Sequence, residues 1–378
     1  MNMATWSSIE LQRHTLIGSS DLAMHQPFDI HNWAARWQQR LNNTPAAAVV
    51  LHQTAVGILG EIPVEQIRDA VRLDSVLILD DEGMAASIRD LQPLIKTMLG
   101  IGMRPQQMLL WSDSGPQSGS LISSAQSLTA FSNPQTNAAA AWSDRVTHHW
   151  VMLARVPRRH RLLAACDIID RGLEHCGKMS CGSGGYQGYT YGPDEFQLVP
   201  QHLRDRFPIY LDGKISSSDS AMHTDSVQLP AVTDAVLHLV CESNWEDPDP
   251  VISDRWKIMQ LTEKSSKPLL LGQLFLINGA LGNVAALREL GFDCFDDIVD
   301  HSYDAEADPL LRVKMVVDQL ETICSQSLAY WQRWRTDNQH RLLANRHKFL
   351  YLAANIQQIN AARLQKALAD IDTRPICN

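Results

Sequence analysis

Residues 240–304 contain, in order, the segments VCES (240–243), LTEKSSKP (261–268), LLLGQLFLING (269–279), LRELGFDCF (287–295) and DHSYD (300–304). The apolar run that leads into Glu242 predicts a buried strand that ends in a carboxylate. Glu263 and Lys264 stand at a predicted helix start, and Asn278-Gly279 closes a second buried strand. Parallel α/β domains bind anionic ligands at the carboxyl ends of their strands, so this stretch predicts such a site.

Working outward, the first half of the chain alternates apolar, Val- and Leu-rich runs with segments of helical spacing. The runs predict strands at 46–52, 75–79 and 107–111, and the intervening spacing predicts helices at 62–73 and 84–100. This alternation is typical of a parallel sheet with crossover helices.

The second half repeats the pattern. A helix is predicted at 161–172, with Gly172 as its stop signal, and residues 309–371 are predicted to be helical. Buried strands are predicted at 147–154, 178–181, 235–240 and 274–277.

The simplest architecture is therefore α/β with two Rossmann-like domains. We expect an N-terminal domain at 1–145, a C-terminal ligand-binding domain at 146–315, and a helical segment at 316–378 that packs back across the first domain.

The composition is that of a globular protein, with 378 residues, 45% hydrophobic and 20% charged. A formal net charge of −9 weighs against a nucleic-acid-binding surface, which is normally basic. The seven cysteines are an odd number and include no CxxC pair, which argues against a disulfide framework and against a zinc site. Without a membrane span or a signal-peptide core, we expect a cytoplasmic protein.

Two cationic groups stand where the predicted strands end and where a helix begins. The first is Arg155, Arg158, Arg159 and Arg161, after the strand at 147–154, and the second is Lys264 and Lys267. Arginine donates paired hydrogen bonds to phosphate. A lysine at a helix start is unfavourable unless an anion binds there. We therefore expect an anionic ligand held without a metal ion, because no Asp-x-Asp flanked by strand signals is present.

Several other candidate ligand-binding residues also have a purely structural interpretation. Thr262 and Glu263 can stabilise the helix start, or Glu263 can accept hydrogen bonds from ligand hydroxyls. Glu242 is either a ligand contact or a cap on the next loop, and Asn278-Gly279 is either a plain turn or a backbone approach to the ligand. In DHSYD, capping of the following helix by Asp304 or Asp308 is the favoured reading.

These motifs, in this order, resemble the donor-binding half of GT-B glycosyltransferases. The similarity is to fucosyltransferase-like proteins of bacteria and phages, through RVPRRHRLLAACDIIDRGL (155–173), TEKSSKP, LRELGFDCF and DHSYD. It covers roughly residues 148–320. Ser243 replaces the Asn of the fucosyltransferase Glu-Asn-Ser segment, which leaves the sugar open.

The resemblance implies transfer of a sugar from a nucleotide-diphosphate sugar to an acceptor hydroxyl. From the cations and the missing Asp-x-Asp we expect a reaction without a metal ion or cofactor, and we expect it to be inverting. The expected donor-binding residues are Arg155, Arg158, Arg159, Arg161, Glu242, Thr262, Glu263, Lys264, Lys267, Asn278 and Gly279. An inverting transferase also needs a base, and Asp81 or Glu82 at a strand end of the first domain is the candidate, with Glu61 and Asp113 as rivals.

Two alternatives remain open. One is a catalytically inactive binding or assembly protein of the same fold, and the other is a phage-type nucleic-acid-modifying glycosyltransferase. The loop GSGGYQGYTYG (182–192) lacks the third glycine of a dinucleotide fingerprint, which argues against a nicotinamide dehydrogenase. No GxxxxGK[ST] loop is present, which argues against a P-loop kinase.

Overall fold

The structure is a computed structural model of residues 1–378. It describes residues 6–11, 14–19, 35, 38, 48–52, 76–81, 97–98, 100, 108–112, 142–154, 157–182, 196–211, 230–242, 245, 261 and 263–372.

The chain divides into two compact units. Unit 1 comprises residues 1–126, 248–258 and 355–378, and unit 2 comprises residues 127–247 and 259–354. The division falls before the expected boundary at 145. It also splits the C-terminal helical segment, whose last part belongs to unit 1.

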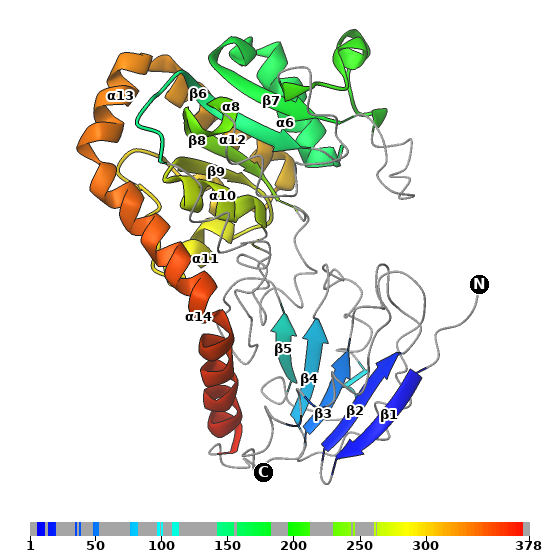
Figure 1. The fold of residues 1–378 in the computed structure, drawn as a ribbon. Coiled ribbons are helices and arrows are strands. Elements are labelled where there is room, and N and C mark those ends of the chain that lie inside the picture. The colour runs from blue at the N-terminus through cyan, green and yellow to red at the C-terminus, as the bar shows by residue number, and fades with distance from the viewer. Residues whose placement is uncertain are drawn as a thin grey trace. The chain divides into compact units, whose positions relative to one another are not determined.

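Unit 1 contains a five-stranded sheet in the order β1-β2-β3-β4-β5 (Figure 1). Its strands are β1 (Trp6–Leu11), β2 (His14–Ser19), β3 (Ala48–His52), β4 (Val76–Asp81) and β5 (Met108–Ser112). Strands β1 and β2 pair antiparallel, and the remaining neighbours are parallel. Strands β1 and β2 were not expected from the sequence, whereas β3, β4 and β5 confirm the three predicted strands to within two residues.

Unit 2 contains a four-stranded, wholly parallel sheet in the order β7-β6-β8-β9. Its strands are β6 (His148–Ala154), β7 (Gly177–Cys181), β8 (Ala235–Cys241) and β9 (Leu274–Asn278). All four strands predicted for this half are confirmed. Every residue of β8 and β9 is buried, which explains why these strands read as continuous apolar runs rather than as alternating patterns.

Helices connect the strands of this sheet, and further helices follow its last strand in the chain (Figure 1). They are α6 (Arg159–Asp170), α8 (Pro230–Thr233), α10 (Glu263–Leu271), α11 (Asn283–Glu289), α12 (Pro309–Ser325), α13 (Leu328–Asp337) and α14 (Gln339–Asp372), with 3₁₀ turns η2 (Leu173–Cys176), η3 (Gln201–Arg206) and η6 (Ser302–Ala305). The predicted helical character of residues 309–371 is confirmed. Gly172 follows α6 with φ of 67°, which confirms its role as a stop signal.

The crossovers place helices on both faces of the sheet. The chain passes from β6 through α6 to β7 in one direction and from β8 through α10 to β9 in the other. Right-handed crossovers in opposite directions put α6 and α10 on opposite faces. Helix α12 packs against α6 and β9, and fully buried Trp150 and Phe275 contribute to the core between sheet and helices.

Within the part of the chain that the structure describes, none of the helices is both long and apolar enough to cross a membrane.

Candidate functional site

The strand order of unit 2 reverses between β6 and β8. From β6 the sheet continues to β7 on one side, and from β8 it continues to β9 on the other. In open parallel sheets, ligands bind outside the carboxyl ends of the strands at such a reversal, because the two crossover helices diverge there. At that point lie the start of α6, which follows β6, and Glu242 and Trp245, which follow β8.

Two side chains from the first turn of α6 converge on one carbonyl group of the β8 end. His160 Nε2 donates to the backbone carbonyl oxygen of Glu242 at 2.9 Å, and Arg161 Nη2 donates to the same carbonyl oxygen at 2.9 Å. His160 is 0% exposed and Arg161 is 3% exposed. Burial, and then the charge of Arg161, hold the pKa of His160 well below its usual value. His160 is therefore neutral, with the hydrogen on Nε2 and an acceptor lone pair on Nδ1.

Trp245, which follows β8, packs against the first turn of α6. Its indole stacks on the His160 ring, with centroids 5.6 Å apart and planes 20° apart. The guanidinium of Arg159 lies over the same indole at 5.5 Å, within cation–π range. Arg312 of α12 donates to the Trp245 carbonyl at 2.9 Å, which anchors this segment to the domain core.

The side chains of Glu242 and Asn278 link the strand ends. Ser265 Oγ donates to Glu242 Oε1 at 2.5 Å, and Asn278 Nδ2 donates to the His160 carbonyl at 3.0 Å. The backbone N–H of Glu242 also donates to the Asn278 carbonyl at 3.0 Å. Glu242 is 0% exposed and Asn278 is 1% exposed. Both predicted ligand residues therefore have clear structural partners.

The two lysines of α10 have different surroundings. Lys264 is half-buried, and its charge is among those that lower the pKa of buried His160, after burial itself and the charges of Arg161 and Arg158. It therefore lies close to the end of β8. Lys267 is 7% exposed, and its charge adds to burial in lowering the pKa of His238, in the middle of β8, to about 3.

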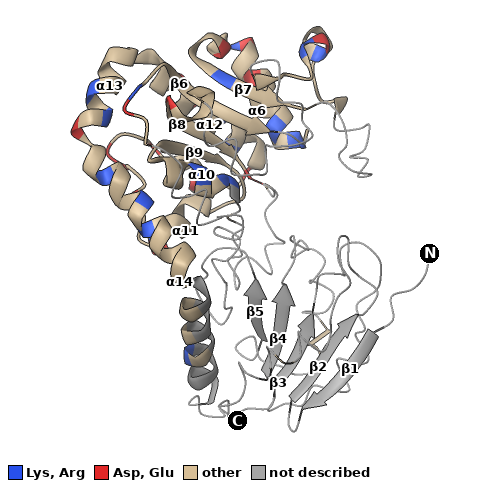
Figure 2. Cartoon of the chain, in the orientation of Figure 1, with Lys and Arg blue, Asp and Glu red and all other residues tan. Residues whose placement is uncertain are grey.

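The local electrostatics are dominated by positive charge. Arg161 has a lowered pKa because of its burial and then because of repulsion from Arg158, an effect that outweighs the attraction of Glu242. Figure 2 shows blue segments at the start of α6 and in α10. Like charges crowd in this way at sites that receive an anion.

Asn283 is a site residue that was not predicted from the sequence. A Cβ added to Gly279 would lie 2.3 Å from Asn283 Nδ2 and 3.1 Å from Glu242 Cβ, so glycine permits this close approach. Asn283 is 0% exposed. Among the residues that the structure describes, neither its Nδ2 nor its Oδ1 has a hydrogen-bond partner, and the same holds for His160 Nδ1 and Asn278 Oδ1. The only sequence signal was the asparagine that follows Gly282, at the start of a short helix.

We call the residues brought together here the strand-end cluster. It comprises Arg158, His160, Arg161, Glu242, Lys264, Ser265, Asn278, Gly279 and Asn283. Arg159 is exposed beside Trp245, and the charge of Lys267 acts on His238 in the middle of β8. Glu263 is the first residue of α10, and Asp81 is the last residue of β4 in unit 1. Arg155, Thr262 and Glu82, together with Glu61 and Asp113, lie outside the described residues.

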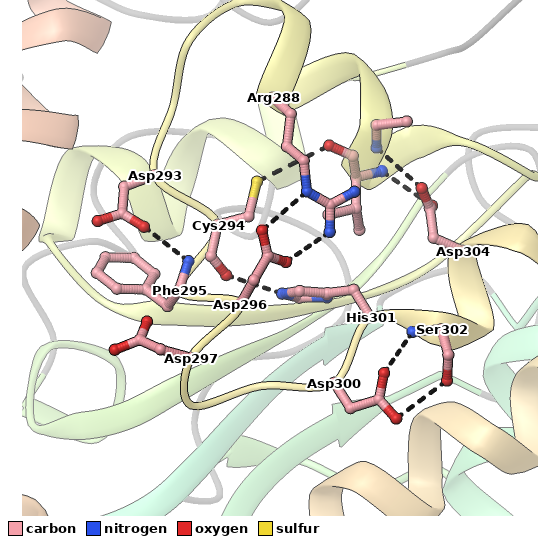
Figure 3. Close-up of polar contacts among 12 residues, drawn as sticks. Arg288, Asp293, Cys294, Phe295, Asp296, Asp297, Asp300, His301, Ser302 and Asp304 are labelled. Atoms are coloured by element: carbon pink, nitrogen blue, oxygen red, sulfur yellow. Dashed lines mark hydrogen bonds and ion pairs between the residues drawn. The ribbon is translucent and has the colours of Figure 1, made fainter.

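The DHSYD segment has a structural role (Figure 3). Asp308 accepts from Leu310 N and Leu311 N at the start of α12, which confirms the predicted capping of the following helix. Asp304 instead caps the preceding helix α11, because it accepts from Val284 N at 2.9 Å and from Ala285 N at 2.8 Å.

The acidic residues around this segment are paired. Asp296 binds Arg288, and Asp297 binds Arg341 of α14, each through two hydrogen bonds. Asp300 accepts from the backbone and the hydroxyl of Ser302. Across the described residues, no three His, Cys, Asp or Glu side chains gather in a way that could hold a metal ion.

Comparison with known proteins finds no similar protein. The chain matches no protein-family model, and searches of curated proteins and of solved structures find no significant match.

Proposed function

We propose that this chain is a glycosyltransferase that transfers a sugar from a nucleotide-diphosphate sugar to an acceptor hydroxyl, with inversion and without a metal ion. The observation that carries the proposal is the gathering of Arg158, Arg161 and Lys264 at the point where the strand order of a parallel sheet reverses. A leaving diphosphate gains negative charge as the glycosidic bond breaks, and preorganised cations there stabilise that charge.

The neutral polar atoms of the strand-end cluster fit the rest of such a ligand. His160 Nδ1 and Asn278 Oδ1 are acceptors, and the Asn283 amide offers both a donor and an acceptor. A sugar or ribose hydroxyl both donates and accepts hydrogen bonds. A buried polar atom without a partner costs free energy that a bound hydroxyl would recover.

The proposal includes a Rossmann-like, GT-B type of architecture for both units and keeps Asp81 or Glu82 as the candidate base. These parts rest on the sequence pattern and on the resemblance of residues 148–320 to fucosyltransferase-like proteins.

The first test is nucleotide binding by calorimetry. We expect GDP, UDP or CDP to bind, and Lys264→Ala to weaken that binding by about 10- to 100-fold, the value of one charge-assisted hydrogen bond to phosphate. Lys314→Ala is the matched control, because Lys314 is 60% exposed and pairs with Asp318 on α12. Circular dichroism establishes that both variants are folded. No binding by any of the three nucleotides overturns the proposal.

A second candidate function is a binding protein of the same fold without catalysis. It is favoured by the hydrogen bonds of Glu242 with Ser265 and of Asn278 with His160, which hold two predicted ligand residues in structural contacts. Incubation with GDP-, UDP- and CDP-sugars separates the two functions. Release of free nucleotide supports the transferase, and nucleotide binding without release at any acceptor concentration supports the binding protein.

A further inference from the structure

The turn that ends α6 brings an imidazole against a thiol. Gly172 adopts the left-handed conformation and starts η2, which contains His175 and Cys176. His175 Nδ1 hydrogen-bonds to the Gly172 carbonyl, and His175 Nε2 lies 3.2 Å from Cys176 Sγ. A carbonyl oxygen only accepts, so the ring hydrogen is on Nδ1 and the Nε2 lone pair faces the thiol.

This arrangement is suited to thiol activation. When the proton moves from Sγ to Nε2, both ring nitrogens become donors, and each already has an acceptor, the Gly172 carbonyl and the Cys176 sulfur. A nucleophile, an adjacent base and a third group that orients the base are the parts that activate catalytic and redox cysteines. His175 is exposed, which places the pair next to solvent, and Cys176 itself is 9% exposed.

A second cysteine lies beside the first. Cys324 is in the last turn of α12, which packs against η2. The ring of His149 bridges the two segments, with Nδ1 at 3.3 Å from the Cys176 carbonyl and Nε2 at 2.8 Å from the Gln326 carbonyl. Burial raises the pKa of Cys324. The charge of Cys176 and a hydrogen bond with Cys176 raise it further. The two thiols are therefore direct neighbours.

Other cysteines of unit 2 lack these features. Burial raises the pKa of Cys166 and of Cys241 to about 11 and that of Cys294 to about 12. Cys294 Sγ lies near two backbone carbonyls, which do not take its proton. These thiols serve as internal controls.

We propose that Cys176 is a peroxide-reactive thiol, with His175 as its base and Cys324 as its disulfide partner. His175 Nε2 takes the Sγ proton, and the thiolate attacks one oxygen of hydrogen peroxide. The O–O bond breaks, Cys176 becomes a sulfenic acid, and the departing hydroxide takes the proton from His175 to form water. The Cys324 sulfur then attacks the Cys176 sulfur, the S–O bond breaks, and the second water leaves with the Cys324 proton. Two thiols are oxidised by two electrons, and one peroxide is reduced to two waters.

The test uses the full-length folded protein with Cys377→Ser as background. One equivalent of hydrogen peroxide is added, remaining thiols are alkylated, and the digest is analysed by mass spectrometry. We expect a peptide cross-linked through Cys176 and Cys324, with Cys166, Cys241 and Cys294 recovered as thiols. In Cys324→Ser, dimedone should trap a sulfenic acid at Cys176, whereas Cys166→Ser should form the cross-link as before.

The role of His175 is tested by the rate of alkylation of Cys176 by iodoacetamide at pH 7. We expect His175→Gln to slow this rate about tenfold, because the thiol then lacks its base. His202→Gln, an exposed histidine of the same unit, is the control. Absence of the cross-link, or alkylation of Cys176 no faster than that of Cys166, overturns the proposal. An unchanged rate in His175→Gln overturns the assignment of the base.

Discussion

At the scale of single residues, the direction of one buried hydrogen-bond chain follows from chemistry alone. His301 Nε2 faces the Cys294 carbonyl at 2.9 Å, so this nitrogen carries the hydrogen. Burial lowers the pKa of His301, which keeps the ring neutral. His301 Nδ1 therefore accepts from the Tyr303 hydroxyl at 2.8 Å, and that hydroxyl accepts from Ile277 N of β9 at 3.0 Å. The aromatic residue of DHSYD thus completes the hydrogen bonding of a strand 26 residues away.

Tyr303→Phe should reduce the free energy of unfolding by about 1–3 kcal/mol, because it leaves a buried N–H and a buried ring nitrogen without partners. Urea unfolding followed by tryptophan fluorescence measures the change. Tyr210→Phe is the control, since Tyr210 is 49% exposed, and it should change stability by less than about 0.5 kcal/mol. Equal stability of the two variants would contradict the proposed chain.

At the scale of elements, helices α11 and α12 begin with caps of different origin. Helix α12 has a local cap, because Asp308 immediately precedes it. Helix α11 has no side-chain cap of its own at Gly282 and takes one from Asp304, 20 residues from Val284. The local cap is visible in the sequence DPLL, whereas the distant cap depends on how the DHSYD segment folds back.

Asp304→Ala should destabilise the protein more than Asp308→Ala. Asp304 is 7% exposed, and its removal leaves one buried and one part-buried N–H group unpaired, so a loss of about 2–3 kcal/mol is expected. Asp308 is exposed, and loss of its cap should cost about 1 kcal/mol. Chemical unfolding of the two variants side by side provides the comparison, and a larger effect of Asp308→Ala would show that the distant cap is not used.

At the scale of the whole molecule, buried neutral histidines couple stability to pH. Burial lowers the pKa of His148, His160, His238 and His301. Below the ordinary value of about 6.5, the unfolded chain binds protons at these residues that the folded chain does not bind. The contribution of these histidines to the free energy of unfolding is therefore fully present above that pH and decreases as the pH falls below it.

Between pH 7.5 and pH 5.5 the free energy of unfolding should decrease, by about 1.4 kcal/mol for each histidine whose folded pKa lies below that window. His238, whose folded pKa is about 3, then accounts for about 1.4 kcal/mol, and the lowered pKa of His160 acts in the same direction. Asp304 opposes the trend, since burial raises its pKa and a raised carboxyl pKa favours the folded state at lower pH. Urea unfolding at the two pH values measures the sum, and His238→Gln should reduce the decrease by about 1.4 kcal/mol. A stability that is constant or rises toward pH 5.5 would refute this account.

Much of the architecture was predictable because its signals are local. Buried parallel strands read as apolar runs, and these located β3 to β9 to within two residues. Gly172 and Asp308 marked a helix end and a helix start through backbone chemistry that acts within a few residues. Strands β1 and β2 were missed because WSSIEL and HTLIGS contain polar residues among the apolar ones and no long apolar run.

The sequence by itself determined the α/β class, the order of the elements of unit 2 and the positions of its strand-end charges, since these depend on hydrophobic period and on residue type at element ends. Only the tertiary structure decided which charges meet. It brought Arg161 to the Glu242 carbonyl, buried the Glu242 side chain against Ser265, and placed Asn283 beside Gly279. It also placed Cys176 beside His175 and Cys324, and it placed Asp304 where its carboxylate caps α11. Most of these contacts join residues far apart in the chain, and their geometry depends on packing that no local pattern records.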